Sequence, residues 1–125
     1  MTTDTLRPLV DTLKALAHPA RLRILALLQG GELCVCEVAE VLGLAASTVS
    51  EHLTGLRRTG LVRERKVGRW VHVALSEAAA ARPVLEALWP LMAAAELDLA
   101  RDRARARTLR CGTCDPSACP VSDPA

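Results

Sequence analysis

The residues of this 125-residue chain best suited to chemistry are its five cysteines. Cys34 and Cys36 stand two residues apart in ELCVCEV, and Cys111, Cys114 and Cys119 lie close together near the C-terminal end. Thiolates are soft ligands that select arsenic, antimony, cadmium, lead, copper(I) or zinc over hard cations. An odd number of cysteines in a chain without a secretory signal favours metal or redox chemistry over a disulfide framework.

The spacing of Cys34 and Cys36 restricts how they can bind one ion. Residues two apart in a regular helix point about 200° away from each other, so a helix would separate the two sulfur atoms. An extended or frayed first turn would bring them closer. The pair therefore requires an irregular backbone if it is to act as one site, and we expect that site where a helix begins.

The elements that must position these residues follow from the apolar periodicity. Helical spacing predicts helices over Thr5–Leu16, from Pro19 to Gly30, over Cys36–Leu42, from Ser47 to Gly60 and over Pro83–Arg107. Alternating residues on either side of Gly68, in 61–67 and 69–75, predict a β-hairpin. The chain has no Phe or Tyr, which suits packed helices, so we predict a mainly α protein with a small β-hairpin.

Two short helices joined by residues 43–46 and followed by a basic hairpin predict a winged helix-turn-helix. The second of these helices offers small and polar groups that can reach base edges in a major groove of double-stranded DNA. Basic side chains follow at its end and on the hairpin, where phosphates would lie. The candidate DNA contacts are Ser47, Thr48, Ser50, Glu51, His52, Arg57, Arg65, Lys66 and Arg69.

Charge and composition narrow the function further. The net charge is only +2, but the segment from Arg57 to Arg69 is strongly basic and contains Glu64 as its sole acidic residue. There is no signal core and no membrane-length apolar stretch, so we expect a cytoplasmic protein that does not contact membranes. No alternating βαβ pattern, Ser/His/Asp set or phosphate loop occurs, and we expect no enzyme activity.

We expect one winged helix-turn-helix and dimerisation domain over residues 1–109 and a flexible, cysteine-containing tail over residues 110–125. The tail sequence CGTCDPSACPVSDPA is rich in Cys, Pro and Ser and predicts no regular element. A chain this short gains burial by pairing with a second copy, which favours a homodimer.

The run from Leu16 to Leu75 resembles the ArsR-type family of metal-sensing repressors. The resemblance rests on LKALAHPARLRILALL, on GELCVCEVAEVLGLAASTVSEHLTGLRRTGLV and on the strand GRWVHVAL. It implies the family's fold, dimerisation through the first and last helices, and release of operator DNA when a metal binds. Ala46 and Glu51 depart from the polar or basic residues that related members often carry.

The resemblance also implies a ligand set. Arsenic-responsive members often carry a third Cys one turn after the pair, where this chain has Ala39. The third sulfur for trivalent arsenic or antimony would then come from the tail, within or across subunits, or the tail trio would form its own site. We favour the first arrangement, because it alone touches the DNA-binding unit. The last helix lacks the His of the family's zinc site.

The sequence therefore predicts a DNA-binding repressor that releases its operator on binding trivalent arsenic or antimony. Three alternatives stay open. Cadmium or lead could be the inducer through a four-sulfur set. Oxidation of Cys34 with Cys36, or of Cys111 with Cys114, could instead switch DNA binding. A constitutive regulator could hold structural zinc in the tail.

Overall fold

The computed structural model describes the backbone of residues 2–109 and the side chains of residues 6–95 and 98–109. The tail cysteines Cys111, Cys114 and Cys119 lie outside these described residues. The order of elements is α1 (Thr2–Leu16), α2 (Pro19–Leu28), β1 (Leu33–Cys34), α3 (Val35–Leu42), α4 (Ala46–Arg58), β2 (Val62–Val67), β3 (Trp70–Leu75), α5 (Arg82–Leu91), η1 (Ala93–Ala95) and α6 (Glu96–Leu109).

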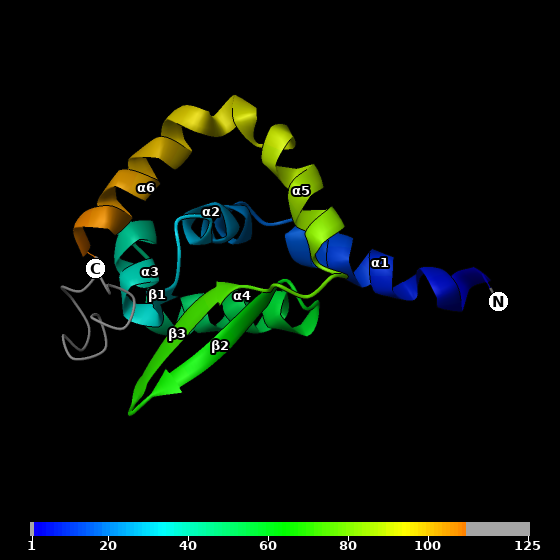
Figure 1. Ribbon diagram of the computed structural model, residues 1–125, viewed down its shortest axis with the longest axis horizontal. Helices are drawn as coiled ribbons and strands as arrows, with labels where there is room; N and C mark the ends of the chain where they lie inside the picture. The colour runs from blue at the N-terminus through cyan, green and yellow to red at the C-terminus, as the bar shows by residue number, and fades with distance from the viewer. Residues whose placement is uncertain (1, 110–125) are drawn as a thin grey trace.

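Helix α2 lies at the centre of the core (Figure 1). Pro19 fits its first turn, because the ring fixes φ and the missing N–H needs no partner there. Residues Ile24 to Leu28 are all buried, and they pack with aliphatic side chains of α3, α4 and the sheet. The buried cluster consists of Leu, Ile, Val and Ala side chains.

Helices α3 and α4 form the helix-turn-helix. Gly43 ends α3 with a φ of 71°, a left-handed conformation that glycine adopts without the strain of a Cβ atom. Helix α4 begins at Ala46 with Ala45 as its N-cap, so Ser47 lies inside the helix and the expected Ser47 start is wrong. Val49, Leu53 and Leu56 are buried at the expected spacing.

The hairpin of β2 and β3 is part of a three-stranded antiparallel sheet with the order β1-β3-β2. The short strand β1 was not predicted, because two residues carry no detectable alternation. Its pairing places Cys34 opposite His72, and His72 also lies opposite Arg65 of β2. We call the hairpin of β2 and β3 the wing. The backbone of Cys34 thus pairs with the wing.

The single helix predicted over Pro83–Arg107 is wrong. Helix α5 ends at Leu91, a 3₁₀ turn follows, and α6 begins at Glu96. Pro90 lies inside α5, where it has no N–H to donate and its ring crowds the preceding turn. Figure 1 shows α5 and α6 meeting at an angle above α2. Arg23 of α2 holds α6 by two hydrogen bonds to Asp102, of 2.8 and 2.9 Å.

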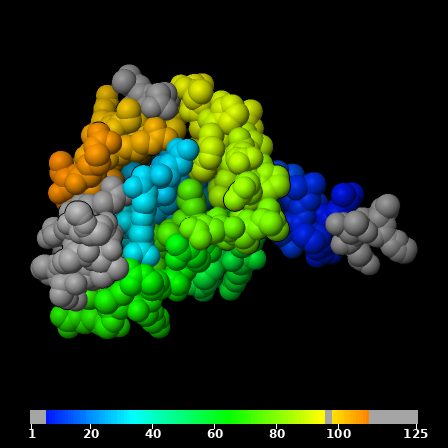
Figure 2. Space-filling view, in the orientation of Figure 1, coloured from blue at the N-terminus to red at the C-terminus, as the bar shows by residue number. Residues whose placement is uncertain are grey.

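Helix α1 projects from the body of the molecule, as Figure 2 shows in blue. Four of its large apolar side chains are exposed, and we call Leu6, Leu9, Val10 and Leu13 the α1 stripe. Leu91 at the end of α5 is exposed as well. Among the helices in the described part of the chain, none combines the length and the apolar character needed to cross a bilayer.

Candidate functional site

Cys34 and Cys36 lie at the junction of β1 and α3. Cys34 is the N-cap of α3 and has an extended backbone, with φ −87° and ψ 159°, whereas Cys36 lies in the first helical turn. Their Sγ atoms are 2.9 Å apart. The irregular backbone at the start of the helix, which the sequence required for a shared site, therefore brings the two sulfur atoms together.

A capping box ties Cys34 to the start of α3. The backbone N–H of Cys34 donates a hydrogen bond of 2.9 Å to Oε1 of Glu37, and the Cys34 side chain accepts from the Glu37 backbone. Both residues are buried. Because a cap satisfies backbone donors that the helix itself cannot, a ligand on the Cys34 sulfur competes directly with the start of α3.

The two cysteines line a cavity of about 280 Å³ between α3, α4 and the wing. Its walls include Leu53 of α4 and Trp70 and Val71 of β3. The polar side chains of Ser50 and Thr54 line it from α4. A ligand held by the cysteines would therefore be in contact with both DNA-binding elements that the sequence predicts.

Within the described residues, no group of three or more His, Cys, Asp and Glu side chains is placed to hold a metal ion. The position one turn after Cys36 is Ala39, which is partly buried against the core. The expected contribution of Cys111, Cys114 and Cys119 stays a prediction, because these residues lie outside the described part of the chain.

The start of α4 presents the predicted reading face. Ser47, Ser50 and Glu51 are exposed, and Thr48 is half-buried. The opposite face of the helix is buried through Val49, Leu53 and Leu56. The exposed set thus stands on a helix whose orientation is fixed by the core, as a helix that enters a groove requires.

His52 of α4 contacts Arg21 of α2. Its Nδ1 accepts a hydrogen bond of 3.1 Å from Nε of Arg21, and its ring is 5.9 Å from that of His18. Partial burial and the positive charge of Arg21 lower the pKa of His52. Gly55 leaves room for Arg21, because a Cβ atom there would lie 2.6 Å from Nη1 of Arg21. His52 therefore has a partner on α2 in addition to its predicted role.

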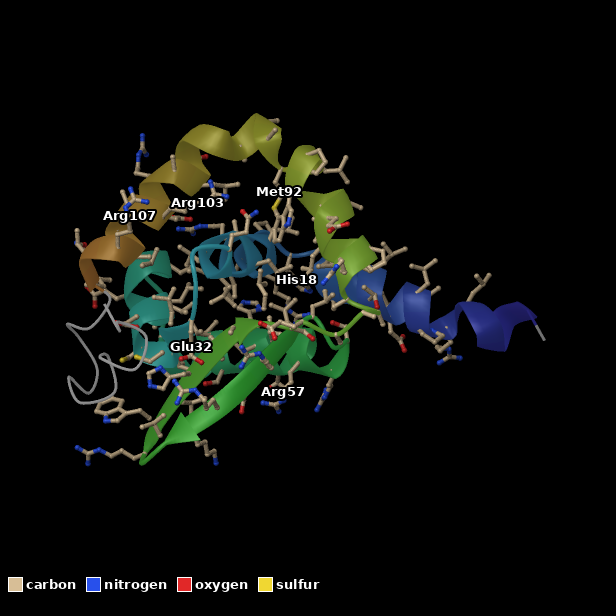
Figure 3. All side chains as sticks on the ribbon, in the orientation of Figure 1. His18, Glu32, Arg57, Met92, Arg103 and Arg107 are labelled. Atoms are coloured by element: carbon tan, nitrogen blue, oxygen red, sulfur yellow. The ribbon has the colours of Figure 1, made fainter. Side chains whose placement is uncertain are left out.

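The wing is attached to the body by Glu32, which Figure 3 labels near the start of α3. Arg65 of β2 donates from Nη2 to Oε1 of Glu32 at 2.5 Å and from Nε to Oε2 at 3.2 Å. These hydrogen bonds lower the pKa of Glu32. Arg57 of α4 likewise forms an ion pair with Glu64 of β2. Two of the predicted phosphate contacts are thus engaged within the protein.

The other basic residues of this region face solvent. Arg58, Arg63 and Lys66 are exposed, and none forms an ion pair with any residue in the described range 6–95 or 98–109. Arg69 lies over the Trp70 ring, with Cζ 5.5 Å from the ring centroid. Exposed cations beside α4 form a surface that suits a polyanion.

Sequence reasoning missed Glu32, Trp70 and His72 at this site. His72 is buried, its Nδ1 lies 4.0 Å from Oε1 of Glu32, and its Nε2 has no hydrogen-bond partner among the described residues. Glu32 carries no signal in the sequence, because its partner is 33 residues away. The alternation in the hairpin could have placed Trp70 and His72 on one face of β3. The cavity could not be predicted in this way, because its walls also come from α3 and α4.

Comparison with known proteins finds bacterial regulatory proteins that are similar in sequence and in structure. A model of the family described as "Bacterial regulatory protein, arsR family" matches residues 18–64. The arsenical resistance operon repressor of Escherichia coli (strain K12) is 44% identical over 68 residues, which cover 54% of this chain. The same match spans 58% of that relative's length, so about two fifths of the relative has no counterpart in the match.

Solved structures resemble the chain over a larger share of its length. Reduced HlyU from Vibrio cholerae has a TM-score of 0.63 and 37% sequence identity, covering 74% of this chain and 96% of that one. A homodimeric winged helix-turn-helix DNA-binding domain from Mycobacterium bovis, described as a possible ArsR-family transcriptional regulator, has a TM-score of 0.64 and 30% identity. It covers 78% of this chain and 88% of its own.

Proposed function

Because the chain belongs to the arsR family of bacterial regulatory proteins, we propose that it is a transcriptional repressor that binds operator DNA as a homodimer. Capture of trivalent arsenic or antimony by Cys34 and Cys36 releases the DNA. One observation carries the proposal: both cysteines line a cavity whose other walls belong to α4 and the wing. The family description is that of a regulator rather than an enzyme.

The DNA-binding part of the proposal is supported by the surface around α4. Ser47, Ser50 and Glu51 are exposed at its start, where a recognition helix contacts base edges. Lys66 and Arg63 on the wing supply exposed positive charge for phosphates. The M. bovis relative is described as a homodimer, and the α1 stripe offers this chain an apolar face for a second copy.

The release step is supported by the capping box. As(OH)₃ exchanges its hydroxyls for thiolates, and the thiol protons leave with the hydroxyls as water. A metalloid bound to Cys34 would draw its sulfur from the backbone N–H of Glu37 and loosen the first turn of α3. Helix α3 packs against α4, so the change would reach the reading face. Couplings of this kind are typically about 1–3 kcal/mol.

We propose that the third sulfur comes from the tail. In this arrangement residues 1–109 form the DNA-binding and dimerisation domain, and residues 110–125 supply Cys111, Cys114 or Cys119 to complete a three-thiolate site. Helix α6 ends at Leu109, and Arg105 of α6 donates a hydrogen bond of 3.0 Å to Glu40 of α3. The described part of the chain therefore ends in a helix that is hydrogen-bonded to α3, which carries the thiol pair.

The test is fluorescence anisotropy on an operator duplex selected from a random pool. The reduced protein is titrated with arsenite, antimonite, cadmium, lead and zinc. We expect arsenite and antimonite to release the wild type, and the Cys34→Ser/Cys36→Ser variant to stay bound at every concentration. The full-length Cys111→Ser/Cys114→Ser/Cys119→Ser variant should respond to arsenite only at higher concentration.

The opposite results are equally clear. If both cysteine variants respond to arsenite as the wild type does, thiol capture is wrong. Release by cadmium or lead alone would favour the alternative inducers. Tail unfolding on zinc removal, with operator affinity unchanged, would favour a constitutive regulator with structural zinc.

The short distance between the two sulfur atoms favours a second candidate function, a thiol redox switch. With the Sγ atoms 2.9 Å apart, little movement separates the pair from a disulfide, whose sulfurs are about 2.05 Å apart. Hydrogen peroxide would take two electrons and two protons from the thiols and leave as water. Release of DNA by peroxide, without release by arsenite, would support this candidate over metalloid capture.

A further inference from the structure

A second cavity lies where α1, α2 and α4 meet, and the thiol pair is not part of its wall. Its volume is about 440 Å³, and it is lined by His18, which Figure 3 labels between these helices. We propose that this cavity binds a phosphate group, carried either by a small phosphorylated compound or by the backbone of DNA. Arg21 binds the phosphate oxygens, and Lys14 and Arg58 supply further positive charge.

The first argument is the charge of the walls. Lys14 of α1, Arg21 of α2 and Arg58 of α4 line the cavity from three different helices. Among the described residues of the wall, Asp11 alone is acidic. None of the three cations forms an ion pair with a residue in the part of the chain that the structure describes. Cations that converge without neutralisation by their own chain attract a multivalent anion.

The second argument is the fixed position of Arg21. Its Nε donates a hydrogen bond of 3.1 Å to Nδ1 of His52, and its Nη1 donates one of 3.1 Å to the carbonyl oxygen of Ala15. The guanidinium lies against α4 at Gly55, where a Cβ atom would be 2.6 Å from Nη1 and 2.8 Å from Nη2. The N–H groups of Nη2 donate to no residue in the described ranges. These donors are therefore held ready for a ligand, which lowers the entropic cost of binding.

The third argument is the match between this wall and a phosphate group. A guanidinium binds phosphate oxygens through two parallel N–H···O bonds, and a phosphate carries more negative charge for Lys14 and Arg58 to balance than a carboxylate does. Both of these side chains are exposed, so a ligand can enter from solvent. The cavity is larger than one phosphate group, so a sugar attached to the phosphate has room as well.

Both sources of the phosphate group suit the position of the cavity. Gly55 and Arg58 lie in the last turn of α4, the helix whose start is the predicted reading face. A DNA phosphate bound here would anchor the far end of α4, whereas a small phosphorylated compound would act on the hydrogen bond between Arg21 and His52. Only the DNA source rests on the proposed function.

The first test is NMR of the histidine rings in the reduced, full-length protein at constant pH and ionic strength. The chain has three histidines, so each ring can be followed separately. Inorganic phosphate and ribose 5-phosphate are the probes, and chloride is the control anion. We expect both probes to shift the His18 signals with a saturating curve and to leave those of His72, which is buried in β3, unchanged. Equal shifts of His18 and His72, or no shift at millimolar phosphate, would overturn the proposal.

Matched variants test the charges of the wall. We expect Lys14→Gln and Arg58→Gln each to weaken phosphate binding about fivefold. Arg7→Gln removes the same charge from an exposed position of α1 outside the cavity and should change binding less than about twofold. Asp11→Asn removes the opposing charge and should tighten binding about threefold, a gain that misfolding cannot produce. Equal losses for Arg7→Gln and Lys14→Gln would show that general surface charge binds the phosphate.

Gly55→Ala tests Arg21 without removing it. The added Cβ atom would displace the guanidinium, so we expect phosphate binding to fall about tenfold or more. Alanine is a better helix former than glycine, which favours a folded variant, and circular dichroism would check this. Unaltered phosphate affinity in the folded variant would remove Arg21 from the site.

Fluorescence anisotropy on operator DNA distinguishes the two sources. If the phosphate belongs to DNA, Lys14→Gln/Arg58→Gln makes the slope of log K against log salt concentration shallower by about 0.9 for each lost contact. If it belongs to a small compound, the slope is unaltered, and ribose 5-phosphate changes the operator affinity of the wild type but not of the variant. If neither effect is seen, both sources are excluded and the proposal is overturned.

Failure of this inference differs from failure of the proposed function. The histidine NMR uses neither DNA nor a metalloid, so saturating His18 shifts support the phosphate site even if the protein releases no operator with arsenite. Unaltered His18 signals together with release of the operator by arsenite would overturn the phosphate site and leave the repressor proposal in place.

Discussion

At the residue scale, Glu32 binds an arginine of the wing that the sequence predicts as a DNA contact. The sequence predicts Arg65 as a phosphate contact, yet its guanidinium is held by the Glu32 carboxylate two residues before Cys34. The Glu32 side chain is 17% exposed and that of Arg65 is 37% exposed, so solvent weakens the pair without removing it. Arg65 therefore positions the wing, whatever it contributes to DNA binding.

The ion pair of Glu32 with Arg65 makes the free energy of unfolding depend on pH in the acid range. Since Arg65 lowers the pKa of Glu32 below 4.5, the folded protein binds this proton less tightly than the unfolded chain. The stabilisation is complete above pH 4.5 and is lost as the pH falls through the lowered pKa. We expect Glu32→Gln to lower the free energy of unfolding at pH 7 by about 0.5–1 kcal/mol and to flatten its acid dependence, as measured by urea denaturation.

The control for this change is Glu77→Gln, at an exposed carboxylate for which no ion pair is found among the described residues. It should leave the urea midpoint and its pH profile unchanged. An identical pH profile for Glu32→Gln and the wild type would show that the wing is not held by this pair.

At the scale of elements, the wing combines two kinds of cation. Arg57 joins α4 to Glu64 of β2, and Arg65 joins β2 to Glu32, the residue before β1, whereas Lys66 and Arg63 are exposed. Only cations of the second kind can reach a phosphate without breaking an ion pair first. The wing is therefore a positioned element with an exposed basic edge rather than a uniformly basic loop.

This division predicts different salt dependences of DNA binding. Each phosphate contact contributes a slope of about −0.9 to log K against log salt concentration. We expect Lys66→Ala to make the slope shallower by about this amount, and Arg65→Ala to weaken binding at all salt concentrations because the wing loses its attachment. Anisotropy measured across a salt series would separate the two effects. A slope that Lys66→Ala does not alter would remove this residue from the phosphate contacts.

The sequence predicted the helix-turn-helix and hairpin because their periodicity is local and unbroken. It did not predict β1, because the pairing of Cys34 with His72 joins residues far apart in the chain. Pro90 is a local signal that predicts the end of a helix, and it could have been used to divide the last helix. The thiol pair was predicted from residue type alone, but its cavity depends on packing between α3, α4 and β3, which no single segment encodes.

At the scale of the whole molecule, the α1 stripe exposes four large apolar side chains on one helix. Leu6, Leu9 and Leu13 are each more than half exposed, and Leu91 of α5 is 76% exposed. Helix α6 instead uses polar side chains against the body of its own chain. Its Asp102, Arg103 and Arg105 form hydrogen bonds with Arg23, Gln29 and Glu40, respectively. A second copy is therefore expected to pair through α1 and the end of α5 rather than through α6.

Dimer formation tests that expectation. We expect Leu9→Lys/Leu13→Lys to raise the dimer dissociation constant about 100-fold or more, because burying one leucine contributes about 1.5–3 kcal/mol. Sedimentation velocity would measure the monomer fraction. Ala79→Lys, at an exposed position outside the stripe, adds the same kind of charge and should leave the dimer intact. A dimer that survives the double substitution would place the contact elsewhere.

Cys34 belongs to two elements at once. Its backbone pairs with β3 opposite His72, while its side chain caps α3. The sulfur takes part in the cap and the backbone in the strand pairing, so the residue has the geometry of a pivot. The quantity that such a pivot alters is the angle between helix-turn-helix and wing. A dimer reads two half-sites at a fixed separation, so a small rotation at each Cys34 would disturb the match with DNA without unfolding either element.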